Sequence, residues 1–118
     1  MDIRQKTVPF EYEGKVYTLR CNFNVLADVQ EENGGDISPA LSGRRGMKNA
    51  LQFLAAMMND WADEQGWEER YTWRELGRAL RPGEVPAGKI FNLVSDALTP
   101  RKTAAEEKPE ETGDSPGN

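Results

Sequence analysis

The chain has 118 residues, a net charge of −5 at pH 7, no histidine and a single cysteine, Cys21. Without histidine, one chain cannot supply Ser-His or Cys-His catalytic pairs, and one cysteine cannot build a structural zinc site. The acidic balance argues against nucleic acid or an anionic membrane as the main partner. No apolar run approaches the roughly 20 residues that cross a bilayer. We therefore expect a cytoplasmic, non-enzymatic protein without metal or cofactor, with one core of its own.

Residues 8–21 alternate apolar and polar side chains on both sides of Glu13-Gly14. This pattern is typical of two strands joined by a two-residue turn. The register that follows pairs Val8 with Leu19, Phe10 with Tyr17 and Tyr12 with Lys15. One face then carries Val8, Phe10, Tyr17, Leu19 and Cys21. A two-stranded hairpin is marginal in water, so helices of the chain or a second copy must cover this face.

The first helix is expected directly after the hairpin, with Asn22 or Asn24 as its N-cap. Its apolar side chains recur every third position, at Phe23, Leu26 and Val29. The sequence Asn33-Gly34-Gly35 is a typical helix end. We expect this helix to lie on the sheet.

Further helical segments are expected at intervals to the end of the domain. They are a short turn at Ser38-Pro39, a central core helix over 47–64, a short helix from Thr72 up to Pro82, and a final helix between Pro86 and Pro100. The central helix has apolar residues at three- and four-residue spacing, and Thr72 with Glu75 forms a capping box. The sequence thus predicts an α+β, mainly α fold, with an N-terminal β-hairpin followed by four to five helices in one domain over 1–100.

Residues 101–118 differ in composition from the rest of the chain. They have no side chain larger than alanine to bury and are rich in Pro, Glu, Gly and Lys. Burial of apolar surface cannot offset the chain entropy of such a sequence. We expect a disordered, acidic C-terminal segment.

Two groups of carboxylates are candidate sites. Asp60, Asp63 and Glu64 follow helical i, i+3, i+4 spacing and can in principle bind a hard cation, but no calcium loop surrounds them. The simpler interpretation, a solvated helix face, is favoured. The second group, Asp28, Glu31 and Glu32, lies close along the first helix, and a catalytic carboxylate pair is the alternative to a solvated face there. Nothing in the sequence places that group in a pocket.

Two groups of cationic residues are candidate anion or partner sites. Residues 42–50, SGRRGMKNA, combine glycines and arginines before a helix, which can bind an anion through backbone donors. The spacing of a phosphate-binding Walker loop is absent, so a plain basic loop is favoured. Arg74, Arg78 and Arg81 form a stripe along one side of a short helix. That stripe is interpreted as a solvated face or, as the alternative, a dock for an acidic partner.

Trp61, Trp67 and Trp73 are spaced six apart, around the end of the central helix and the loop after it. Tryptophan is a frequent anchor in interfaces, but it is more often a core residue. Both interpretations stay open.

The order of these elements resembles that of the tail assembly chaperones of long-tailed bacteriophages and related gene transfer agents. The resemblance covers about residues 8–98. It rests on FEYEGKVYTLR, NFNVLADVQEENGG, ALSG, the long alanine- and leucine-rich helix and TWRELGRAL. The connection over 63–71 and the segment after Pro100 depart from the family pattern.

The resemblance implies a cytoplasmic protein that binds the tape measure protein, helps recruit tail tube protein and is absent from the finished particle. It also implies many copies on one tape measure, and thus a homo-oligomer. The partner-binding candidates are Phe10, Tyr17, Trp61, Trp67, Trp73, Arg74 and Arg78. The alternatives are a minor tail or head-completion protein retained in the virion, and a small regulatory enzyme or its inhibitor.

Overall fold

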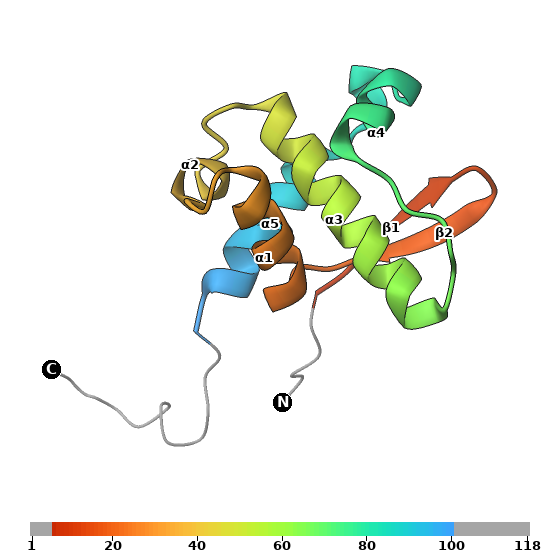
Figure 1. The fold of residues 1–118 in the computed structure, drawn as a ribbon, viewed down its shortest axis with the longest axis horizontal. Coiled ribbons are helices and arrows are strands. Elements are labelled where there is room, and N and C mark those ends of the chain that lie inside the picture. The colour runs from red at the N-terminus through yellow and green to blue at the C-terminus, as the bar shows by residue number, and fades with distance from the viewer. Residues whose placement is uncertain (1–5, 101–118) are drawn as a thin grey trace, which may run out of the picture.

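A computed structural model of the chain describes residues 6–100, which form an N-terminal hairpin followed by helices (Figure 1). The elements are β1 (Val8–Tyr12), β2 (Lys15–Leu19), α1 (Phe23–Glu32), α2 (Ser38–Leu41), α3 (Met47–Gln65), α4 (Trp73–Ala79), a 3-10 turn (Pro82–Glu84) and α5 (Ala87–Leu98). The predicted α+β, mainly α fold class is confirmed. The prediction of disorder over 101–118 lies outside the described residues.

The hairpin has the predicted register, with Val8 opposite Leu19, Phe10 opposite Tyr17 and Tyr12 opposite Lys15. Glu13 and Gly14 form its turn, and both have positive φ angles, 51° and 80°. A two-residue turn with positive φ at both positions matches the right-handed twist of the strands, which is why glycine is favoured there.

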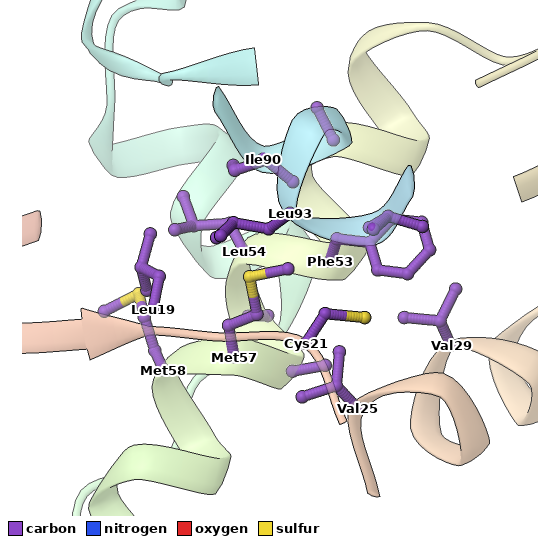
Figure 2. Packing of buried hydrophobic residues seen from close by; sticks show 14 of the residues in the cluster. Leu19, Cys21, Val25, Val29, Phe53, Leu54, Met57, Met58, Ile90 and Leu93 are labelled. Atoms are coloured by element: carbon purple, nitrogen blue, oxygen red, sulfur yellow. The ribbon is translucent and has the colours of Figure 1, made fainter. Parts of the chain in front are cut away.

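Helix α3 crosses the centre of the molecule, with the hairpin and α4 on one side of the view and α1, α2 and α5 on the other (Figure 1). It packs against β2, α1, α4 and α5. Its middle is therefore buried on nearly all sides, from Asn49 to Met58 with only Leu51 partly exposed. Figure 2 shows Phe53, Leu54, Met57 and Met58 of α3 among side chains from the hairpin, α1 and α5. The prediction of a central core helix is confirmed.

Helix α1 packs mainly on α3, and the sheet is covered by α3 instead. The expectation that α1 lies on the sheet is therefore wrong. Its buried residues are Val25 and Val29, whereas Phe23 is 86% exposed. Asn22 is the N-cap and accepts a hydrogen bond from the Val25 N–H at 3.1 Å. Phe23 is consequently the first helical residue and lies off the packed face, which contradicts its place in the predicted apolar stripe. Leu26 and Val29 of that stripe do pack on the core, together with Val25.

The capping box at the start of α4 is confirmed. The Glu75 N–H donates to the Thr72 hydroxyl at 3.1 Å, and the Thr72 N–H donates to the Glu75 carboxylate at 2.8 Å. Two backbone donors of the first turn are satisfied in this way. The box fixes where α4 begins, at the end of the connection from α3.

Candidate partner-binding site

Asp60 of α3 is a buried carboxylate, 8% exposed, that joins three parts of the chain. Arg20 donates to it from Nε at 3.2 Å, and the Nη2 atom of Arg20 forms an ion pair with the same oxygen at 3.2 Å. The Nδ2 atoms of Asn22 and Asn24 donate at 2.8 and 3.3 Å. We call these four residues the Asp60 cluster. The favoured interpretation of Asp60 as part of a solvated face is wrong, because three hydrogen bonds and a guanidinium charge from residues that follow β2 compensate the loss of water around its charge.

The other end of α1 is also fixed to α3. Asn33 donates from Nδ2 to the Val29 carbonyl at 2.7 Å and to Gln52 Oε1 at 3.0 Å. Asn49 donates to the same Gln52 oxygen at 2.9 Å. Gln52 and Asn49 are both buried, so these polar contacts form away from water and are expensive to break. Helix α1 is thus held by hydrogen bonds at both ends.

This attachment presents Phe23 to solvent. The two asparagines on either side of Phe23 both bond Asp60, which leaves the intervening ring pointing away from the core at 86% exposure. Trp61 follows Asp60 along α3, is partly buried, and lies with its ring centroid 5.3 Å from the Arg20 guanidinium. Phe23 and Trp61 are thus each next in sequence to residues of the Asp60 cluster, and we call these two residues the aromatic patch. Sequence reasoning assigned Phe23 to the core; the asparagines on both sides of it were the available signal.

A second surface is a groove of about 430 Å³ on the outer side of α3. Its floor is formed by Ala55, Ala56 and Asn59 of α3. Its walls are Asp28, Glu31 and Glu32 of α1 on one side, and Asp63, Arg70, Tyr71 and Thr72 on the other. We call it the α1–α3 groove. The second wall is fixed because Asn59 exchanges two hydrogen bonds, of 2.8 and 2.9 Å, with the backbone of Tyr71.

The groove is strongly acidic along α1. Burial, and then repulsion from neighbouring carboxylates, raises the pKa of Asp28 and of Glu32. Neither residue nor Glu31 forms an ion pair with a described residue, whereas Asp63 pairs with Arg70. The groove therefore attracts cationic groups. Within residues 6–100, no three side chains of the types His, Cys, Asp or Glu are placed to hold a metal ion together.

A third surface is basic and centred on Trp73. The partly buried indole lies 5.1 Å from the Lys48 ammonium and 4.7 Å from the Arg74 guanidinium, measured to the ring centroid. Arg78 is exposed one turn further along α4. We call Lys48, Trp73, Arg74 and Arg78 the basic face. Arg74 and Arg78 of the predicted stripe are exposed on α4, and Lys48 from α3 lies beside them at the tryptophan. The prediction that Arg81 continues the stripe is wrong, because α4 ends at Ala79 and Arg81 has extended backbone.

Two predicted contact residues lie in the core instead. Tyr17 is fully buried and Phe10 is 9% exposed, because α3 and the connection after it cover the hairpin face. The Trp67 ring packs edge-on against Tyr17, with 5.3 Å between the ring centroids. The Lys15 ammonium lies 4.9 Å from the centroid of the Trp67 ring. The prediction that Phe10 and Tyr17 are partner anchors is wrong. Trp67 is partly buried and closes the same cluster.

Cys21 is buried in the core. Burial raises the pKa of its thiol to about 11, so the sulfur stays protonated at neutral pH. A protonated thiol is a weak nucleophile and a poor metal ligand. Cys21 therefore contributes packing.

Comparison of the chain with protein-family models, curated proteins and solved structures gives no match. Among the helices of residues 6–100, none is long and apolar enough to span a membrane. The function is therefore inferred from the three surfaces and from the order of the sequence elements.

Proposed function

We propose that the protein is a tail assembly chaperone of a long-tailed bacteriophage, which binds the tape measure protein in the host cytoplasm and promotes assembly of the tail tube. In this proposal it is not an enzyme and needs no cofactor. The observation that carries the proposal is the exposure of Phe23, 86%, on a stretch of backbone that the Asp60 cluster holds on both sides.

Covering an exposed aromatic ring with a partner removes apolar surface from water, which favours binding. Here the contacts of Asn22 and Asn24 with Asp60 hold the backbone on both sides of the ring. Less backbone entropy is then lost when a partner binds, and a partner that covers the ring buries its apolar surface. Trp61 beside the Asp60 cluster enlarges the apolar contact. The aromatic patch therefore suits an apolar ridge on a helical partner.

The resemblance to the chaperone family supports the identity of that partner. A tape measure protein is long and helical with apolar regions, which must be shielded until tail tube subunits enclose them. Shielding a long protein requires many copies of a small one, so the proposal includes self-association. Contact with tail tube protein, as in the family, is also part of the proposal.

The test is capture of a tape measure segment by co-expression with the full-length protein. Replacing Phe23 by alanine should weaken capture by about 2 kcal/mol or more, the size of a hot-spot effect. The matched control is Val16→Ala, because Val16 is also an exposed apolar side chain, at 55%, but lies on the hairpin. Both variants should keep the melting temperature of the wild type, since neither side chain is in the core.

Two results would contradict the proposal. One is equal capture by the Phe23→Ala variant and the wild type, and the other is a wild-type protein that captures no tape measure segment. Mass spectrometry of purified particles addresses the alternative, since a structural virion protein is retained and a chaperone is not.

A further inference from the structure

The α1 carboxylates of the α1–α3 groove and the arginines of the basic face carry opposite charges. Asp28, Glu31 and Glu32 have no ion-pair partner among residues 6–100, and the same is true of Arg74 and Arg78. Like charges gathered on one surface repel each other, and a complementary surface relieves that repulsion.

The side chains at the centres of the two surfaces also complement each other in size. The floor of the groove consists of small side chains, Ala55 and Ala56, between an acidic wall and the fixed backbone of Tyr71. The basic face has a partly exposed tryptophan, Trp73, between two cations. An apolar or aromatic centre surrounded by a polar rim is the usual composition of a protein interface.

We propose that the basic face of one copy docks into the α1–α3 groove of a second copy. Trp73 then lies over the alanine floor, and the two arginines of α4 face the carboxylates of α1. This contact is the surface through which the self-association in the proposed function would occur, and it rests on the self-association alone. It uses neither Phe23 nor Trp61.

The two surfaces adjoin on one chain, which favours a pair related by two-fold symmetry. Thr72 lines the groove and is also the N-cap of α4, and Lys48 is close enough to Glu32 to oppose the rise of its pKa. In a two-fold pair each copy uses both of its surfaces at once. A polyanion such as nucleic acid would instead meet the α1 carboxylates next to the basic face. A second copy is therefore the better occupant.

Two charge-reversed proteins test the contact, one for each side of it. The groove variant is Glu31→Lys with Glu32→Lys, and the face variant is Arg74→Glu with Arg78→Glu. Lysines in the last turn of α1 favour the helix dipole, so the groove variant should fold. In the face variant, Arg74→Glu places a negative charge in the first turn of α4, where the helix dipole favours it. This gain offsets the unfavourable negative charge that Arg78→Glu places in the last turn. The matched control is Glu11→Lys with Glu13→Lys, which makes the same charge change on the hairpin.

Sedimentation velocity over a range of protein concentrations measures the association. At about 50 mM salt the wild type should approach twice its monomer mass of 13.2 kDa, and at about 500 mM salt it should dissociate more readily. Each variant alone should associate about ten-fold more weakly or worse, while the control behaves as the wild type. An equimolar mixture of the two variants should recover the dimer, because each then meets its complement.

Several outcomes would overturn this inference. They are a wild type that stays monomeric at low salt, a mixture that fails to recover the dimer, and a control that weakens association as much as the variants do. Binding of a lysine-rich peptide or an oligonucleotide by a strictly monomeric wild type would also overturn it. The Phe23→Ala variant should dimerise normally, so loss of tape measure capture and loss of dimerisation are separate results.

Discussion

The acidic residues of α3 and α1 show two opposite uses of a carboxylate in one small protein. Asp60 of α3 is buried and accepts hydrogen bonds from Arg20, Asn22 and Asn24. Asp28 and Glu32 of α1 border an open groove, and no described residue pairs with them. The first carboxylate holds the fold together, and the second group leaves its charge available to a partner.

The difference comes from the donors around each carboxylate rather than from its position on a helix. Burial penalises both sites, because each loses water. At Asp60 a guanidinium and two amides replace that water, and the charge becomes a link between β2, α1 and α3. At Asp28 and Glu32 the neighbours are other carboxylates, which raise their pKa further. Removing Asp60 should therefore cost stability, whereas neutralising the groove should not.

The largest expected effect is that of Asp60→Ala. The change removes the acceptor for Arg20 and two asparagines, and leaves the mostly buried guanidinium with the exposed Glu64 as its counter-charge among the described residues. Loss of one partner of a buried pair typically costs 3 to 5 kcal/mol, and we expect about 3 kcal/mol here because Arg20 keeps its contact with Glu64. Urea unfolding at neutral pH measures it. Asp63→Ala is the matched control, since that exposed carboxylate pairs only on the surface and its loss should cost under about 1 kcal/mol. Equal losses in the two variants would contradict the distinction drawn above.

A smaller effect is expected from Asn22→Ala. Asn22 caps α1 through its Oδ1 and bonds Asp60 through its Nδ2. Loss of a cap costs about 1 kcal/mol and loss of the second hydrogen bond about 1 kcal/mol more. The control Asn24→Ala removes only the longer bond to Asp60, so its cost should be about half as large or less. A larger loss in the control than in Asn22→Ala would show that the cap is not what holds α1.

Local features of the fold were predictable from sequence. The hairpin register follows from alternation around Glu13-Gly14, and the start of α4 follows from the spacing of Thr72 and Glu75. In each case the residues that decide the structure are only a few positions apart, so the pattern and its cause are visible together.

The surfaces depend on residues that are distant in the sequence. Asp60 is buried because the chain brings it to Arg20, 40 positions earlier, and helical spacing on α3 carries no information about that approach. The exposure of Phe23 has the same origin, since its flanking asparagines turn toward Asp60. Phe10 and Tyr17 were wrongly predicted to contact a partner, because the residues that bury them are also distant in the sequence. The elements that cover them, α3 and the connection after it, follow the hairpin in sequence and give no local sign of where they pack.

The smallest expected effect is on the pH dependence of stability, and it concerns Asp28 and Glu32. Their pKa is raised in the folded state by burial and by neighbouring carboxylates. At neutral pH these carboxylates are ionised in both the folded and the unfolded protein, so their raised pKa in the folded state destabilises the fold. As the pH falls through the raised pKa, the folded protein binds protons before the unfolded protein does, and this destabilisation is lost. Asp28→Asn with Glu32→Gln should therefore be more stable than the wild type at pH 7, with an advantage that shrinks toward the ordinary pKa of these groups. Urea midpoints measured from neutral to acidic pH give this difference directly. Glu11→Gln with Glu13→Gln removes the same number of charges from the hairpin, and an identical pH profile in that control would assign the effect to net charge and not to the groove.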